Sequence, residues 1–417
     1  MSETAPLTVL HLAANRWWTG SAEPIIRLLV GLRARGHRVL LGLIPGDRFE
    51  QKAREAGLDP LAGLSLEVRG HPLHSLADLR RVRSIVRAER VDVIHVHHSH
   101  DHWLGRLGRQ SAALVRTFHN ARAVRLGWPT TSLYRSTDGV IAVSHEIAAR
   151  CHEAGITSDR IARLDGVVDL GRFEHADGAA IRKEFDLGSA PVLGCVARLA
   201  PRRGHELLLR GFRLLLADRP DARLLLVGKG EARAPLEALV AALGLAREVR
   251  FTGYRDADLP DVLQALDAFT LMGAGSDESC RAVLEAMAAA RPVVARRVGA
   301  LPETVVHGST GLLVDDDRPE SVAAALRALL ADPERAAAMG RAGRERALRQ
   351  FSPARHAEAV EQIYRAALLR GAALRMRGPG HGPRTPPGGG QPLGGGQPSG
   401  GGQPSGGDQP LGGEPAR

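Results

Sequence analysis

Short apolar runs alternate with longer amphipathic segments along the first 155 residues of the chain. The runs are rich in Leu, Val and Ile and predict buried strands. The segments between them repeat their apolar residues every three or four positions, as helices do. We expect strands at 7–14, 37–44, 91–98, 113–119 and 138–144, and helices at 22–36, 76–90, 101–112 and 145–155. This alternation predicts a parallel sheet with helices on both faces.

The same pattern restarts near residue 190. Here we expect strands at 190–199, 222–228, 249–253, 267–272 and 291–298, helices at 204–220, 232–244, 258–266 and 279–290, and then only helices through residue 370. The fold class is therefore α/β, with two doubly wound Rossmann-like domains that face a cleft. We assign 1–173 to the first domain, 174–352 to the second, and 353–373 to a helix that packs back towards the first.

Residues 374–417 differ in composition from everything before them. They form an approximate six-residue repeat of Gly, Gln and Pro with almost no apolar side chains. Such a segment cannot bury enough surface to offset its ordering entropy, so we expect a disordered tail that acts as a spacer. Binding by the tail is the alternative.

Composition restricts the class of protein. Of 417 residues, 44% are hydrophobic and only 4% aromatic, so the cores must be aliphatic. Three separated cysteines form no disulfide framework and are typical of a reducing cytosol. The opening MSETAPL lacks the basic start and apolar core of a secretory leader, and no apolar run is long enough to cross a bilayer. We expect a cytoplasmic protein, at most peripheral on the inner face of the membrane.

The positive charge is concentrated in the first domain. Residues 1–173 carry 24 Lys and Arg against 17 Asp and Glu, a surplus of 7 out of a net charge of +10. Such a surplus could attract an anionic membrane surface or a phosphorylated acceptor. A preference for Arg codons explains the excess of Arg over Lys equally well. Nucleic acid is disfavoured as a partner, because no basic run has interleaved aromatic residues.

Three motifs fall where predicted strands end, which is where open α/β sheets bind ligands. In WTGSAE, Gly20 allows a backbone turn before a helix, a weak signal for phosphate binding. In ARLAPRRGHELL, Arg198 follows a strand and Arg203 precedes a helix, so the two could clamp a diphosphate; a solvated arginine-rich turn is the alternative. In GSDESCRAVLEAM, Asp277 lies in a loop and Glu285 inside an apolar helix, where a lone carboxylate points to a ligand such as a ribose diol.

Together these motifs resemble those of the retaining glycosyltransferases of family 4, which have the GT-B architecture. The resemblance covers roughly residues 7–370. The family's glutamate-x7-glutamate motif reads DESCRAVLE here, with Asp277 at the first position, and its arginine–lysine pair reads Arg198 and Arg203. Its GGAE loop reads GSAE, with Ser21 for a glycine. The three departures could alter donor preference. DGVVD and the histidine of VRTFHN, His119, also match, and the bacterial cell-envelope and lipopolysaccharide members are the most similar.

The resemblance implies a metal-independent hexosyltransferase without a cofactor, whose nucleotide-sugar donor is held mainly by the second domain. It implies that Arg198 and Arg203 stabilise the departing diphosphate, that Asp277 holds sugar hydroxyls and that His119 lies by the reacting sugar. It further implies a set of donor-binding residues: Gly20, Ser21, Tyr254, Arg255, Ser279, Cys280, Arg281 and Glu285. A glycan or lipid-linked acceptor would bind the first domain.

The stretch HVHHSHDHW carries five histidines in eight positions. On a strand His95 and His97 share one face, whereas His98 and His102 could share one face of the next helix. That spacing also occurs in metal sites, but no Cys or Glu completes a ligand set, so we expect no metal. We instead expect His97, His98 and His102 to form a polar wall on the acceptor side. Simple packing remains possible for His95.

Two other functions stay open. Nucleotide-sugar 2-epimerases share the two-domain layout, although they would need further catalytic carboxylates. A non-catalytic scaffold could keep the fold and bind through its basic face and its tail. Intact Arg198, Arg203 and Glu285 favour sugar transfer over both.

Overall fold

The computed structural model describes residues 5–15, 22–67, 72–274 and 280–376; at 72 and 373–376 only the backbone is described. Gly20, Ser21, Asp277, Ser279 and the tail after residue 376 lie outside these ranges. Among the described residues, no helix is both long and apolar enough to cross a membrane. All three cysteines are buried.

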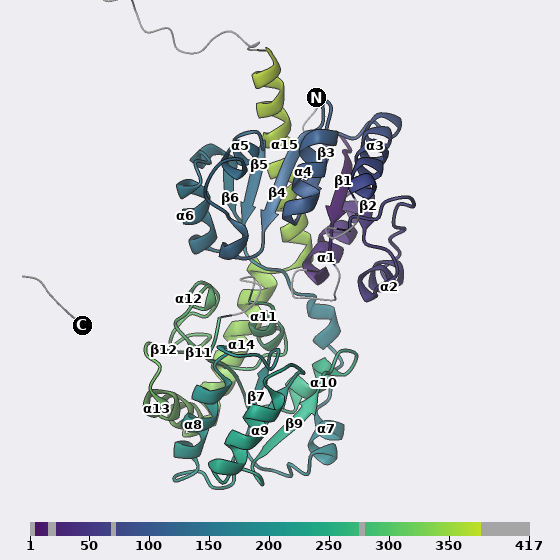
Figure 1. Cartoon of the computed structure of the whole chain (residues 1–417). Coiled ribbons are helices and arrows are strands. Elements are labelled where there is room, and N and C mark those ends of the chain that lie inside the picture. The colour runs from purple at the N-terminus through teal and green to yellow at the C-terminus, as the bar shows by residue number, and fades with distance from the viewer. Residues whose placement is uncertain (1–4, 16–21, 68–71, 275–279, 377–417) are drawn as a thin grey trace, which may run out of the picture. The chain divides into compact units, whose positions relative to one another are not determined.

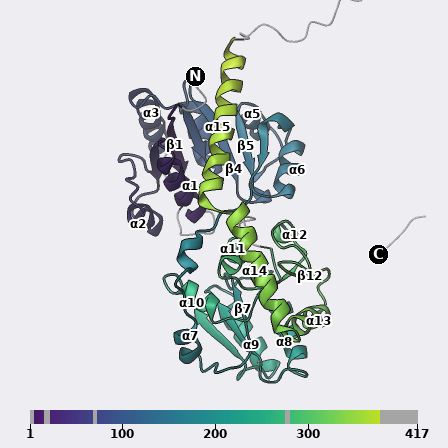
Figure 2. The same cartoon turned by 180° about the vertical axis from the view of Figure 1, so that it is seen from behind.

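Two parallel sheets form the framework, as the alternating pattern predicts, but each has six strands where we expected five (Figures 1 and 2). The first has the order β2-β1-β3-β4-β5-β6 and the second β12-β11-β10-β7-β8-β9. The strands of the first sheet are β1 Thr8–Ala13, β2 Arg38–Leu43, β3 Val93–Val96, β4 Ala113–Phe118, β5 Gly139–Ala142 and β6 Ile161–Arg163. Those of the second are β7 Val192–Val196, β8 Arg223–Val227, β9 Val249–Gly253, β10 Ala268–Leu271, β11 Val293–Arg296 and β12 Gly311–Val314.

Helices connect successive strands. In the first half these are α1 Ala22–Ala34, α2 Arg48–Glu55, α3 Pro72–Ala88, α4 Ser99–Gly108, α5 Thr130–Arg135 and α6 His145–Glu153. In the second half they are α7 Ala179–Glu184, α8 His205–Leu215, α9 Arg233–Ala242, α10 Leu259–Gln264, α11 Arg281–Ala288, α12 Leu301–Thr304, α13 Pro319–Leu330, α14 Pro333–Gln350 and α15 Pro353–Met376. Short 3-10 turns occur at Ala121–Ala123, Ser158–Arg160 and Leu170–Phe173.

Both faces of the first sheet are buried, and the side chains along each strand point alternately to one face and to the other. Leu10, Ile94 and Leu114 pack with residues of α3 and α4. Val9 and Val93 face the other way, into a core that α1 and α15 close. Helix α15 contributes Ala357, Val360, Tyr364 and Ala367 to this core, so the end of the described chain packs on the first sheet (Figure 2).

One expected segment is wrong. We expected only helices after residue 298, but Gly311–Val314 is the edge strand β12, paired with β11. A run of four apolar residues is too short for its period to be recognised. Gly311 allows this pairing, because a Cβ atom there would lie 2.1 Å from the Val293 carbonyl oxygen.

Buried histidines make the fold sensitive to acid. Burial lowers the pKa of His11 and His119 to about 3 and that of His205 and His356 to about 4. The unfolded chain therefore binds more protons below pH 6.5, and stability falls as pH falls from 6.5 towards these values. For His205 alone, the loss between pH 7 and pH 5 is about 2 kcal/mol.

We expect His205→Met to reduce the loss of unfolding free energy between pH 7 and pH 5 by about 2 kcal/mol. Neither ring nitrogen of His205 has a hydrogen-bond partner in the described part of the chain, so the variant should stay folded at pH 7. Urea unfolding at the two pH values measures the change. The exposed His152→Gln serves as the control; an equal flattening in the control would contradict the assignment.

Candidate functional site

Two glycines bring the Arg203 turn against the loop that follows β10. Gly204 has φ +78° and precedes α8, and a Cβ there would lie 2.4 Å from the backbone of Met272. A Cβ on Gly273 would lie 2.4 Å from the backbone of Arg203. Only glycine permits so close an approach of two backbones. Arg203 is thereby held next to Ala274, whose carbonyl oxygen accepts a 2.8 Å hydrogen bond from its guanidinium.

A second pair of glycines shapes the turn that carries Arg198. Cβ atoms on Gly228 and Gly230 would lie 2.0 and 2.1 Å from the carbonyl oxygens of Ala197 and Leu199. The loop after β8 therefore runs directly against the loop after β7. Arg198 lies at this contact and forms a 2.9 Å ion pair with Glu231, with both side chains mostly exposed. A largely solvated pair of this kind is weak, so Arg198 can exchange partners.

Positive charge accumulates around Arg203. Its pKa is lowered first by burial and then by repulsion from Arg198 and Arg122. Glu231 is the carboxylate that opposes this effect. Three guanidinium groups near one acidic group form a site suited to an anion with more than one charge, such as a diphosphate. The sequence did not single out Arg122, which lies in the 3-10 turn Ala121–Ala123 and carries no motif of its own.

Glu285 is buried in α11, directly beside Arg281 of the same helix. The Arg281 guanidinium donates to it over 3.0 Å, and Arg172 lies 3.9 Å away. Burial raises the pKa of Glu285, whereas the charge of Arg281 lowers it. The Glu285 carboxylate is therefore paired with a guanidinium group of its own helix. Cys280, the residue before this helix, has a left-handed backbone conformation with φ +52°.

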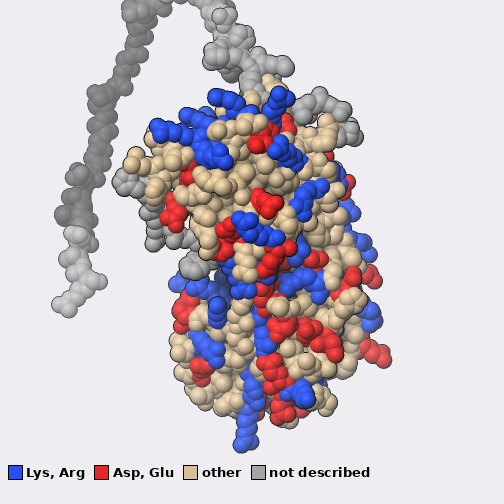
Figure 3. Space-filling view, turned by 90° about the vertical axis from the view of Figure 1, so that its right-hand side faces the viewer, with Lys and Arg blue, Asp and Glu red and all other residues tan. Residues whose placement is uncertain are grey.

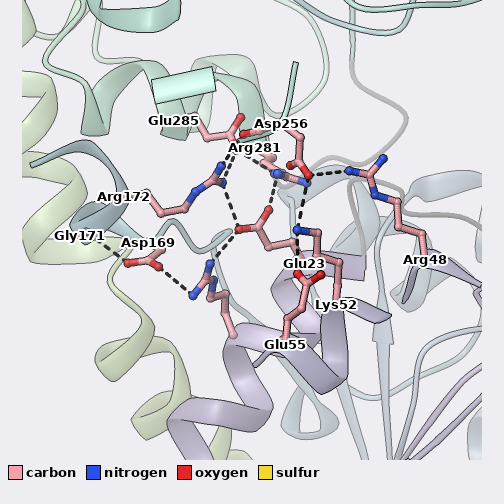
Figure 4. Close-up of polar contacts among 11 residues, drawn as sticks. Glu23, Arg48, Lys52, Glu55, Asp169, Gly171, Arg172, Asp256, Arg281 and Glu285 are labelled. Carbon is pink, nitrogen blue, oxygen red and sulfur yellow. Dashed lines mark hydrogen bonds and ion pairs between the residues drawn. The ribbon is translucent and has the colours of Figure 1, made fainter. Parts of the chain in front are cut away.

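Glu285 belongs to a network that joins both halves of the chain (Figure 4). Glu23 of α1 pairs with Arg281 and lies 3.6 Å from Arg172. Next to it, Arg27 pairs with Asp169 over 2.8 Å. A ligand hydroxyl that binds Glu285 must compete with Arg281, which can keep Glu23 as its partner.

Tyr254 and Arg255 follow β9 but lie in different surroundings. The partly exposed Tyr254 ring lies between Arg48 and Lys229, each 5.3 Å from its centroid. Arg48 also pairs with Asp256 over 2.7 Å. Arg255 instead pairs with Asp258 over 2.6 Å and with Glu184. The Tyr254 ring thus contacts two cationic side chains, and two carboxylates balance the Arg255 charge.

The three acceptor-side histidines lie in three different environments. His97 is buried between His11 and His119, at 3.3 and 3.2 Å. His98 precedes α4 and contacts Asn15. His102 is buried on α4 and bonds Thr137 over 2.8 Å. Because α4 begins at Ser99, His98 is not part of that helix, and the structure does not gather the three residues into one wall.

Nitrogen atoms of His11, His95 and His97 lie within 4.8 Å of one another, close enough for one metal ion. Both nitrogens of His95 already have partners, the Tyr364 hydroxyl and the Thr117 hydroxyl, each at 2.7 Å. The Tyr364 hydroxyl also lies 3.1 Å from His11. The described residues thus satisfy one another without an ion, and the sequence pointed to neither His11 nor Tyr364.

His119 lies at the end of β4 and lines a small cavity with Thr117, Asp165 and His356. Its Nδ1 atom is buried and has no hydrogen-bond partner among the described residues. Burial first, and then the charges of His98 and Arg116, lower its pKa to about 3. His119 is therefore neutral at ordinary pH, and Nδ1 is its ring nitrogen without a partner among the described residues.

Comparison with known proteins identifies this arrangement. The family described as glycosyl transferases group 1 matches residues 179–346, and glycosyltransferase family 4 matches residues 18–172. The chain is 36% identical over 262 residues to the GDP-mannose-dependent alpha-(1-6)-phosphatidylinositol monomannoside mannosyltransferase of Mycolicibacterium smegmatis, covering 59% of this chain and 68% of that protein. It is 31% identical to the Mycobacterium tuberculosis protein of the same name, covering 76% of this chain and 86% of that one.

A D-inositol 3-phosphate glycosyltransferase of Segniliparus rotundus is 35% identical, over 67% of this chain and 68% of that protein. Among solved structures, Anabaena HepE in complex with UDP and glucose superposes with a TM-score of 0.73 at 21% identity, covering 85% of this chain and 98% of HepE. This likeness supports the GT-B fold. The chain belongs to glycosyltransferase family 4 and is a glycosyltransferase with the GT-B fold.

Proposed function

We propose that the chain transfers a hexose, with retention and without a metal ion, from a nucleoside-diphosphate sugar to a glycan or lipid-linked acceptor of the cell envelope. The cluster of Arg198, Arg203 and Arg122 carries this proposal. It supplies three cations beside the start of α8, where a diphosphate gains charge as its bond to the sugar breaks. Arg203 is fixed by the Ala274 carbonyl group and needs no reorganisation.

The remaining donor contacts are inferred from the surroundings of Glu285 and Tyr254 and, for the other residues, from the family resemblance. Glu285 accepts hydrogen bonds from the ribose diol after Arg281 yields one of its contacts. Tyr254 stacks beside the base. Asp277 is assigned to the sugar hydroxyls, and loop groups complete the donor site: Gly20, Ser21, Ser279 and Cys280.

The transfer itself exchanges one C–O bond for another. The acceptor hydroxyl attacks the anomeric carbon from the face that the diphosphate leaves, which preserves the configuration. The new C–O bond forms as the bond to the diphosphate oxygen breaks, and that oxygen takes the acceptor's proton. His119, neutral and lacking a nearby partner for Nδ1, contributes a hydrogen bond to the sugar.

The nature of the acceptor is supported by the relatives and by surface charge. Two of the relatives act, by name, on a phosphatidylinositol mannoside, and their donor is GDP-mannose. Helix α3 carries Arg80, Arg81, Arg83 and Arg87, and Lys and Arg gather over this part of the face shown in Figure 3. A basic face favours an anionic lipid surface. We place the enzyme at the cytoplasmic face of the membrane, with GDP-mannose as the first donor to test.

We expect Arg203→Ala to lower kcat for nucleotide release from GDP-mannose by about 10²–10³-fold, because it removes a fixed donor to the developing charge. Arg198→Ala should have a smaller effect in the same direction, since that side chain is largely solvated. The matched control is Arg233→Ala, which breaks an exposed pair with Glu237 on α9. Wild-type rates in both Arg198→Ala and Arg203→Ala would contradict the proposed site.

A thermal-shift comparison of GDP-, UDP- and ADP-sugars tests the donor. We expect a GDP-sugar to stabilise the protein most, by about 2.7 kcal/mol at a ligand concentration 100 times Kd. Glu285→Gln should remove most of this stabilisation, because an amide is a poorer acceptor for a diol than a carboxylate. Glu237→Gln on the exposed face of α9 is the control. Equal stabilisation of the two variants would exclude Glu285 from the donor site.

A further inference from the structure

Six buried side chains form one continuous run of hydrogen bonds in the first half of the chain. Thr117 contacts His95 Nε2 over 2.7 Å, and His95 Nδ1 contacts the Tyr364 hydroxyl over 2.7 Å. The hydroxyl contacts His11 Nε2 over 3.1 Å, and His11 Nδ1 contacts His97 Nε2 over 3.3 Å. The run continues from His97 Nδ1 to His119 Nε2 over 3.2 Å. We call it the histidine chain; it ends at the free Nδ1 of His119.

Strand register places the histidine chain on one face of the first sheet. His11 of β1 lies beside His95 of β3, which lies beside Val115 of β4. Residues two positions further along a strand return to the same face, so His97, Thr117 and His119 join them. Helix α15 covers this face and supplies Tyr364 between His95 and His11. Strand and helix segments 269 residues apart thus share one network.

Neutrality fixes the direction of the hydrogen bonds. The pKa values of all four imidazoles are lowered, chiefly by burial, and that of Tyr364 is raised by burial. Each imidazole therefore carries one N–H and donates one hydrogen bond. If the Tyr364 hydroxyl donates to one imidazole and accepts from the other, two arrangements remain: every imidazole is protonated at Nδ1, or every imidazole is protonated at Nε2. If the hydroxyl instead accepts from both His95 and His11, its own hydrogen lacks an acceptor among the described residues, which disfavours this third arrangement.

The Thr117 end favours the first arrangement. With Nδ1 protonated throughout, Thr117 uses its hydrogen to donate to His95, and the free donor is His119 Nδ1–H. With Nε2 protonated throughout, Thr117 accepts from His95, and its own hydrogen then has no acceptor among the described residues. His119 Nδ1 lacks a partner in both arrangements, so the second leaves one more polar group unpaired. A buried polar group without a partner costs about 1–3 kcal/mol, so the arrangement with fewer of them is preferred.

We propose that the histidine chain holds His119 as the Nδ1–H tautomer, so that it presents a neutral N–H donor to an oxygen atom of the transferred sugar. Thr117, His95, Tyr364, His11 and His97 act as positioning residues in this scheme. The proposal rests on the proposed function for the identity of the ligand, but the tautomer is a property of the free protein. It also gives α15 a role in the site, since Tyr364 joins the two halves of the histidine chain.

The tautomers are measured directly in the full-length protein labelled with ¹⁵N-histidine. Long-range ¹H–¹⁵N correlation spectra distinguish a protonated ring nitrogen from an unprotonated one, and single His→Gln variants assign the signals. At pH 7.5 we expect His11, His95, His97 and His119 all to be protonated at Nδ1. Protonation of His119 at Nε2, or a mixture of its two forms, would overturn the proposal.

Variants that cut the histidine chain test its effect on catalysis. Thr117→Val and Tyr364→Phe should each let His119 populate both tautomers and lower kcat/KM for nucleotide release about tenfold, the value of one hydrogen bond. Thr117→Ser keeps the hydroxyl group and should therefore keep both the single tautomer of His119 and the wild-type kcat/KM. Thr270→Val and Tyr134→Phe are matched controls, because they remove other buried hydroxyl groups that bond to backbone groups.

A double-mutant cycle separates positioning from general stability. In a His119→Ala background, Thr117→Val should cause no further loss of activity, because the group that it positions is gone. An undiminished tenfold loss there would show a purely structural effect and would contradict the proposal. If no nucleotide sugar reacts at all, the proposed function fails, but the NMR measurement still decides the tautomer of His119.

Discussion

The candidate site at the edge of the second sheet depends on two places where backbones touch. Gly204 and Gly273 bring the loops after β7 and β10 together, and Gly228 and Gly230 bring the loop after β8 against the first of them. A side chain at any of these positions would collide with backbone at 2.0 to 2.4 Å. Parallel strands put their carboxyl ends on one edge, and these contacts turn that edge into a compact set of loops. The arginines are consequently close together although like charges repel.

The ion pairs around this edge can exchange one charged partner for a ligand. Pairing with Arg281 offsets the cost of burying the Glu285 carboxylate. Glu23, in the other half of the chain, pairs with the same guanidinium group. A polar ligand can therefore replace one contact of Arg281 without leaving a buried charge unpaired, which would be costly. Arg198, with a solvated partner, can move at still lower cost. The charged groups that pair with one another here are the same groups that we propose to receive a nucleotide sugar.

The sequence was sufficient for the fold and for the place of two candidate arginines in it. Alternating strands and helices predicted both sheets, and the turns around Arg198 and Arg203 fell where they were expected. It was insufficient for β12, whose four residues are too few to show a period. It also could not reveal His11 or Tyr364 as neighbours of His95, because strand register and the packing of α15 bring them together across long stretches of chain. The partner of Glu285 lay only four residues away, but whether Arg281 points to it or to solvent depends on burial.

Burial of the histidines limits the chemistry of the first half. A catalytic base at neutral pH works best with a pKa near the working pH, and the pKa of His119 is about 3. Its neutral ring can donate a hydrogen bond, but it is too weak a base to hold the acceptor's proton. His356, at about 4, is no better suited. In the proposed reaction the leaving diphosphate is a chemically adequate base, and the arginines proposed to stabilise it would also keep it next to the reacting hydroxyl. That proposal therefore assigns both proton transfer and leaving-group stabilisation to one site, on the edge of the second sheet.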